Sequence, residues 1–198
     1  MYIGIIGRKN DDKITFNKEI IDVIKKYDFI PLGIIVDFEN NSDNEFIKTK
    51  PLIDLCSGII LQGGSDYYDI DIIITKYLHK NNIPTLGICL GMQTMAMAFN
   101  GNMGDINNHK SDKLYVHSVD INKDSKLYDI LKKDKIIVNS RHKSYIINTD
   151  LKVSGQANII EAIEDNAKDF FIGVQWHPET LMDENSILLF NNFFSSIK

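Results

Sequence analysis

The organisation of this chain follows from one stretch near its middle, Pro84-Thr85-Leu86-Gly87-Ile88-Cys89-Leu90-Gly91. Its apolar first part predicts a buried strand over residues 84–88. A helix is expected to follow directly, from residue 90 to about residue 99, where Asn100-Gly101-Asn102 ends it. A strand that passes straight into a helix is typical of a βαβ unit, so the sequence predicts an α/β fold.

The same alternation continues on the amino-terminal side of this stretch. Strands are expected at residues 2–7, 31–36 and 58–61, and helices at 16–27 and 69–81. This order predicts a mostly parallel sheet covered on both faces. After Gly104 the expected strands come closer together, at 115–121, 135–139, 151–157, 159–164 and 170–176, with helices at 125–131 and 184–197. We therefore expect an antiparallel portion in the second half of a single domain, residues 1–198.

Composition excludes several classes of function. The 198 residues are 43% hydrophobic and 25% charged, which is typical of a globular domain. The net charge of -5 provides no general attraction to nucleic acid or an anionic membrane. No apolar run reaches the roughly 20 residues of a membrane span, and the first residues lack the features of a signal peptide. We expect a cytoplasmic protein without a cofactor or metal, because no nucleotide motif occurs and His109 and His117 lack ligand spacing.

Cys89 stands at the centre of a G-x-C-x-G pattern at residues 87–91. Between a strand and a helix, this pattern predicts a nucleophile elbow, in which glycines relieve crowding around a tight turn. The start of a helix favours the reactive thiolate, and the N–H of Leu90 is suitably placed to bind an oxyanion. The alternative is a strand that ends in a buried, inert cysteine. That is our interpretation of Cys56, which lies among apolar neighbours.

A candidate base follows the last expected strand, in Trp176-His177-Pro178-Glu179. Pro178 favours extended geometry at His177, and residues two apart in an extended chain project to the same side. Glu179 is therefore expected to orient the imidazole of His177 while its other nitrogen faces the thiol. Alone, a histidine is more often structural and a glutamate after proline more often belongs to a solvated turn. Trp176 is expected to pack in the core.

Taken together, these motifs resemble class I glutamine amidotransferases, and among them the γ-glutamyl-γ-aminobutyrate hydrolase group of C26 peptidases. The matching stretches, in chain order, are Ile60-Leu61-Gln62-Gly63-Gly64-Ser65-Asp66, Gly87-Ile88-Cys89-Leu90-Gly91-Met92-Gln93, Val138-Asn139-Ser140-Arg141-His142, Glu161-Ala162-Ile163-Glu164 and Gly173-Val174-Gln175-Trp176-His177-Pro178-Glu179. The resemblance extends over roughly residues 3 to 197.

The resemblance implies a flavodoxin-like, three-layer α/β/α sandwich that cleaves a γ-glutamyl amide through a γ-glutamyl thioester. It assigns the catalytic triad to Cys89, His177 and Glu179, the oxyanion hole to Gly64 and Leu90, and glutamyl binding to Gln93, Ser140 and His142. The chain departs from the hydrolase group in two places. It has His142-Lys143-Ser144 where the group has H-H-Q, and its segment from residue 64 to residue 89 is short. Both departures put the usual leaving amine in doubt.

Basic residues suggest a hypothesis about that leaving group. Arg8 and Lys9 follow the first expected strand, at the edge where open α/β sheets bind their ligands, and Arg141 precedes His142. These three residues are candidate contacts for an anionic leaving group, such as a carboxylated amine or a nucleotide phosphoramidate. Ordinary solvated surface charge is the alternative for each of them.

Three functions remain open at this point. The first is a free-standing hydrolase with a small-molecule γ-glutamyl substrate, monomeric or homodimeric. The second is a glutaminase subunit that delivers ammonia to a synthase on another chain. The third is an inactive binding module on the same fold, against which all three filled triad positions argue.

Overall fold

The computed structural model describes residues 1–107 and 109–197. Its strands are β1 (Tyr2–Ile6), β2 (Arg8–Asn10), β3 (Lys13–Thr15), β4 (Ile30–Ile34), β5 (Cys56–Leu61), β6 (Thr85–Ile88), β7 (Asn102–Asp105), β8 (His117–Ile121), β9 (Lys135–Val138), β10 (Ser144–Asn148), β11 (Lys152–Gln156), β12 (Ile160–Glu164) and β13 (Phe171–Val174). Strands β2 and β3 form a separate hairpin, and in the described residues the other strands form one sheet. The central order of that sheet is β4-β1-β5-β6-β13-β12-β11-β8-β9, with β10 pairing to β12 and to β7.

The sheet has two halves that differ in strand direction. All pairings from β4 to β13 are parallel, and we call these five strands the parallel half. All pairings from β13 onward are antiparallel, and β12, β11, β8, β9, β10 and β7 form the antiparallel half. The mixed sheet expected from the sequence is confirmed.

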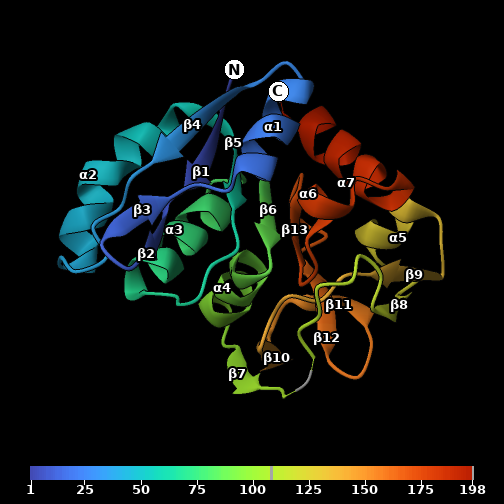
Figure 1. The fold of residues 1–198 in the computed structure, drawn as a ribbon. Coiled ribbons are helices and arrows are strands. Elements are labelled where there is room, and N and C mark those ends of the chain that lie inside the picture. Colours follow the sequence, from blue (N-terminus) through green and yellow to red (C-terminus); the bar gives the residue numbers. More distant parts are fainter. Residues whose placement is uncertain (108, 198) are drawn as a thin grey trace.

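Helices cover both faces of this sheet (Figure 1). They are α1 (Lys18–Lys26), α2 (Ser42–Asp54), α3 (Asp69–Lys80), α4 (Leu90–Ala98), α5 (Lys126–Leu131), α6 (Pro178–Leu181) and α7 (Glu184–Ser195). Strand alternation divides the apolar residues between two cores: Ile60 packs with α1, α5 and α7, whereas Ile59 and Leu61 pack with α2, α3 and α4. The three-layer α/β/α sandwich is confirmed. In the described ranges, no helix has the length and apolar character needed to cross a bilayer.

Several short elements escaped the sequence interpretation. Helix α2 was not predicted because its polarity is inverted: Glu45 and Thr49 are buried, whereas Ile47 and Leu52 are exposed. It also contains Pro51, which normally argues against a helix interior. The hairpin β2–β3 and the strands β7 and β10 were missed as well, since such short runs carry little periodic signal.

Candidate active site

Cys89 lies on a sharp turn between β6 and α4. Its φ of 54° and ψ of -106° place a non-glycine residue in a rarely populated region, which is a form of strain that clusters at functional sites. Its N–H donates to the carbonyl of Val174 at 2.8 Å, so the turn is tied to the adjacent strand β13. A Cβ on Gly91 would lie 1.9 Å from the carbonyl oxygen of Leu61, so no larger residue fits there. The turn predicted from G-x-C-x-G is present.

His177 reaches Cys89 because β13 runs beside β6. Val174 pairs with Ile88 at the ends of these parallel strands, so the residues that follow them emerge at the same edge of the sheet. The imidazole of His177 lies beside the side chain of Cys89, and its Nδ1 lies 2.7 Å from Oε1 of Glu179. The structure therefore brings the predicted nucleophile, base and orienting carboxylate together.

The backbone conformation that brings Glu179 to His177 differs from the expected one. His177, with φ of -107° and ψ of 86°, lies outside the extended region, and helix α6 begins directly after it at Pro178. Glu179 belongs to the first turn of that helix and still faces the imidazole. The extended-chain argument was wrong in this detail, since proline is also favoured in the first turn of a helix.

Two asparagines that the sequence interpretation did not single out hold this arrangement. The amide group of Asn139 accepts from the N–H of His177 at 2.8 Å and donates to its carbonyl at 3.0 Å. Asn17 caps α1 through its side-chain oxygen and donates from Nδ2 to Oε1 of Glu179 at 3.2 Å. Asn139 stood inside the V-N-S-x-H stretch, but that motif did not indicate this role. Asn17 fell inside the helix expected at residues 16–27, which in the structure begins only at Lys18, so its capping role was missed.

The two cysteines have opposite electrostatic surroundings. Burial lowers the pKa of His177, but its hydrogen bonds with Cys89 and Glu179 raise that pKa more strongly, to about 10. The imidazole is therefore protonated at neutral pH, which places a positive charge beside the side chain of Cys89. By contrast, burial raises the pKa of the Cys56 thiol to about 11. Cys56 is the inert buried thiol that we expected.

Cys89 opens onto a cleft of about 850 Å³, which we call the Cys89 cleft. The residues that line it are Gly64, Ser65, Cys89, Gln93, Asp105, Ile106, Asn107, Lys110, Arg141, His142, Lys143 and Ser144. The glycine loop closes one side: a Cβ on Gly63 would lie 3.0 Å from Cε1 of His177, and one on Gly64 would lie 2.9 Å from Cδ2 of Leu90. The loop thus approaches the Cys89 turn closely, because it has no side chains there.

The residues predicted to hold the glutamyl group occupy different places. Gln93 lines the Cys89 cleft, and its Nε2 donates to the carbonyl of Ser144 at 2.9 Å and to Oε1 of Gln175 at 3.1 Å. His142 also lines the cleft. Ser140 is fully buried outside the lining, and its carbonyl accepts from the N–H of Ser111 at 2.8 Å. Ser140 is therefore better placed to support the cleft wall than to touch a ligand.

The three candidate leaving-group contacts also separate. Arg8 is buried, and its guanidinium lies 2.7 Å from the carboxylate of Asp71. Lys9 forms an ion pair with Glu39 and lines a different depression. Of the three, Arg141 alone lines the Cys89 cleft. Arg8 and Lys9 thus have structural partners, and the leaving-group hypothesis is left with Arg141 and two lysines of the lining, Lys110 and Lys143.

The antiparallel half adds a group of residues that the sequence interpretation dismissed as lacking ligand spacing. His109, His142 and Glu161 offer atoms that all lie within 4.8 Å of one another, the arrangement of a possible metal site. Burial lowers the pKa of His142. Burial by itself would raise the pKa of Glu161, but the neighbouring imidazoles of His109 and His117 lower that pKa below its usual value. Consecutive spacing could not reveal this group, because its members are far apart in the chain.

Comparison with known proteins agrees with this fold. The mixed sheet, the flanking helices and the Cys–His–Glu arrangement define a class I glutamine amidotransferase-like enzyme, a hydrolase of carbon–nitrogen bonds. Residues 66–179 match the model of the Peptidase C26 family, and the chain belongs to that family.

Relatives and solved structures add further likenesses. The chain is similar to a GMP synthase [glutamine-hydrolyzing] of Francisella tularensis subsp. novicida (strain U112), with 31% identity over 165 residues, 81% of this chain and 30% of the relative. It therefore spans less than a third of that relative. The fold matches the glutaminase domain of CTPS from Trypanosoma brucei with bound acivicin, at a TM-score of 0.72 and 18% identity, covering 99% of this chain and 93% of the other. It also matches a glutamine amidotransferase from Methylobacillus flagellatus, at a TM-score of 0.74 and 12% identity, covering 99% and 95%.

Proposed function

We propose that this chain, acting as one catalytic domain, hydrolyses a γ-glutamyl amide to glutamate and a free amine. The observation that carries the proposal is the strained Cys89 turn in direct contact with the His177–Glu179 pair. A thiol held at a helix start beside an imidazolium is an activated nucleophile. A cytoplasmic setting is part of the proposal, because a reactive thiol and a free Cys56 suit a reducing compartment.

The reaction proceeds in two halves. In the first, Sγ of Cys89 forms a bond to the γ-carbonyl carbon, the carbon–nitrogen bond breaks, and His177 gives its proton to the leaving amine. In the second, His177 takes a proton from water as the water attacks the thioester. The carbon–sulfur bond then breaks, which releases glutamate and restores the starting pair of Cys89 and protonated His177. Glu179 holds the imidazole in position and stabilises its positive charge throughout.

The oxyanion of each tetrahedral intermediate would be bound by backbone N–H groups. Leu90 is the first residue of α4, where N–H groups have no partner within the helix. Gly64 lines the same cleft and lies against the Leu90 side chain. Both groups are backbone N–H donors, which can bind a developing negative charge without moving a side chain.

The charge of the cleft supports an anionic leaving group. The lining contains three cationic side chains, Lys110, Arg141 and Lys143, and one carboxylate, Asp105. A positive wall of this kind attracts a carboxylated amine or a phosphoramidate more strongly than a neutral amine.

A second candidate, a glutaminase subunit that supplies ammonia to a synthase on another chain, is favoured by the likeness to a glutamine-hydrolysing GMP synthase. The chain covers only 30% of that relative. The two candidates share the Cys89 chemistry and differ in whether the isolated chain is active. A catalytically inactive binding module does not account for the filled triad.

The deciding experiment measures glutamate release by the purified chain from glutamine, γ-glutamyl-aminobutyrate and a γ-glutamyl phosphoramidate. Activity on one conjugate, lost in Cys89→Ala and kept in Cys56→Ala, would support the hydrolase. Activity on glutamine that appears only when a synthase is added would support the subunit. Both proposals would be overturned if the chain releases no glutamate under either condition and Cys89 does not react with iodoacetamide at neutral pH.

A further inference from the structure

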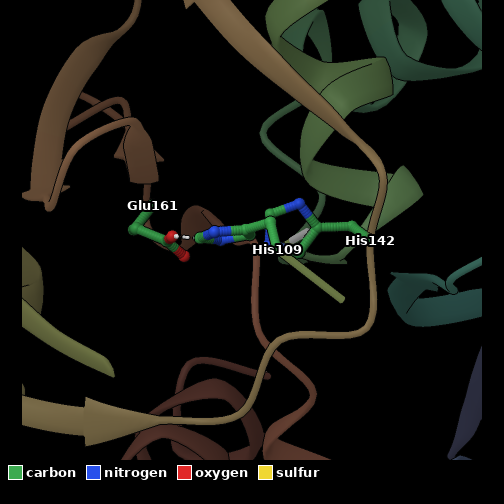
Figure 2. Close-up of side chains that lie close together, drawn as sticks. All are labelled: His109, His142 and Glu161. Atoms are coloured by element: carbon green, nitrogen blue, oxygen red, sulfur yellow. Dashed lines mark ion pairs between the residues drawn. The ribbon is translucent and has the colours of Figure 1, made fainter. Parts of the chain in front are cut away.

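Three histidines and one glutamate gather where the Cys89 cleft meets the antiparallel half. We call His109, His117, His142 and Glu161 the His–Glu cluster. Glu161 comes from β12, His117 from the start of β8, His109 from the connection between β7 and β8, and His142 from the loop before β10. Figure 2 shows His109 between Glu161 and His142. The ring of His109 lies 4.7 Å from that of His142 and 4.9 Å from that of His117, measured between centroids.

The cluster surrounds a carboxylate that has no contact with water. Glu161 is fully buried, and its ion-pair partners in the described part of the chain are the rings of His117, at 2.9 Å, and His109, at 3.7 Å. The second distance is too long for a hydrogen bond. A buried carboxylate needs a close positive charge or full hydrogen bonding, and here Oε2 of Glu161 has no partner.

Two imidazole nitrogens near this carboxylate are also buried and have no hydrogen-bond partner, Nε2 of His142 and Nε2 of His109. Nδ1 of His142 lies 3.0 Å from the carbonyl oxygen of Ser144, which can only accept a hydrogen bond. Nδ1 of His142 must therefore carry the proton, and Nε2 presents a lone pair. A ring fixed by a backbone carbonyl in this manner is the usual state of a metal-binding histidine.

We propose that His109, His142 and Glu161 bind one divalent transition-metal ion of the Zn²⁺ type. Two imidazoles and one carboxylate form a known ligand set for zinc, with further positions left to water. Zinc bonds of about 2.0–2.2 Å place tetrahedral ligand atoms roughly 3.3–3.6 Å apart, so the present limit of 4.8 Å requires only a modest contraction. His117 does not join this group of ligands, but its bond to Glu161 orients the carboxylate, as the outer partners of metal sites do.

A bound ion would also brace the wall of the cleft. His109 precedes Lys110 and His142 follows Arg141, and both of these basic residues line the Cys89 cleft. Through its three ligands, the ion would link the segments that contain Lys110 and Arg141 to strand β12 of the sheet. This consequence rests on the proposed function, whereas binding of the ion does not.

The test uses the full chain with Cys89→Ala, so that the thiol cannot bind the metal. The protein is stripped with a chelator, titrated with Zn²⁺ against a competing chelator, and loaded with Co²⁺ for its visible spectrum. We expect one ion per chain, Co²⁺ bands typical of nitrogen and oxygen ligands, and a rise in Tm with Zn²⁺. Adding His117→Ala should weaken binding by about 10–100-fold, and adding His109→Ala or Glu161→Gln by more.

His79→Ala is the matched control, because Nε2 of His79 also contacts a carboxylate, Oδ2 of Asp165 at 2.7 Å, outside the cluster. Metal binding should be unchanged in this variant, and circular dichroism would establish that each variant is folded. If the folded Cys89→Ala chain binds no stoichiometric Zn²⁺ or Co²⁺, or if His79→Ala weakens binding as much as His109→Ala, the proposal is wrong. Neither result depends on hydrolysis, so failure here is distinct from failure of the proposed function.

Discussion

The two halves of the sheet build their polar sites in different ways. In the parallel half, Cys89 and His177 follow neighbouring strands, β6 and β13, whose paired ends bring them to one edge. In the antiparallel half, the His–Glu cluster draws its members from two strands and two connecting segments. The comparison teaches that the site of the parallel half uses residues that directly follow strands within motifs visible in the sequence, whereas the members of the His–Glu cluster stand in no common motif and are brought together only by the fold.

The largest effect is expected in the parallel half, from Glu179→Gln. The pKa of His177 is held at about 10, and Glu179 is one of the groups that raise it. Removing this negative charge lowers the pKa, so His177 loses its proton at a lower pH. We expect kcat/KM to fall by up to about 10⁴-fold and its upper pH limb to move from near 10 toward neutrality. A pH–rate profile measures both.

Asn17→Ser is the control for this prediction, because serine keeps an N-cap acceptor for α1 while removing the 3.2 Å bond to Glu179. The upper limb should barely move in this variant. An unchanged upper limb in Glu179→Gln would mean that the carboxylate does not set the protonation of His177.

Arg8→Ala tests whether a cation beside the parallel half is structural. The variant leaves the carboxylate of Asp71 buried without its partner, so we expect a loss of about 3–5 kcal/mol in the free energy of unfolding. Urea unfolding measures the loss. The paired change Arg8→Met, Asp71→Asn should recover most of it, and the preference for anionic over neutral conjugates should stay the same. A changed preference would return Arg8 to the leaving-group site.

Two glycine-to-alanine substitutions compare how well the backbone beside each half of the sheet tolerates an added Cβ atom. The Cβ atom of an alanine at Gly91 would lie 1.9 Å from the carbonyl oxygen of Leu61. Because this contact is with backbone rather than a flexible side chain, we expect a loss of about 1–3 kcal/mol or more in the free energy of unfolding. An alanine at Gly104 meets the ring of Tyr145 at 3.0 Å, which can shift, so the change should stay within about 0.5 kcal/mol. Urea midpoints that are equal for both variants would break the comparison.

The smallest effect on catalysis belongs to the antiparallel half. Arg141→Ala removes one of three cations from the Cys89 cleft. We expect KM for an anionic conjugate to rise by up to about fivefold, equivalent to about 1 kcal/mol or less, with kcat unchanged. Arg141→Lys should retain most of the affinity. If a neutral conjugate is affected equally, the residue acts on the shape of the cleft and not through its charge.

The sequence predicted the main elements of the parallel half because each one carries its own signal. Apolar runs marked β1, β5 and β6, helical periodicity marked α1 and α3, and G-x-C-x-G marked the turn at Cys89. Helix α2 lacked such a signal, because Glu45 is buried where it accepts a hydrogen bond from the N–H of Asp37 and Thr49 is buried where it donates to the helix carbonyl of Glu45, and local periodicity reports neither.

What the sequence alone determined is thus the α/β class, the Cys89 turn and the proximity of His177 to Glu179, all of which depend on residues close together in the chain. Only the tertiary structure decided that Arg8 pairs with Asp71, that Asn139 holds His177, and that His109, His142 and Glu161 meet. These contacts span tens of residues, and strand order brings them together. Sequence spacing does not encode that order, because pairing between distant segments depends on how the whole sheet closes.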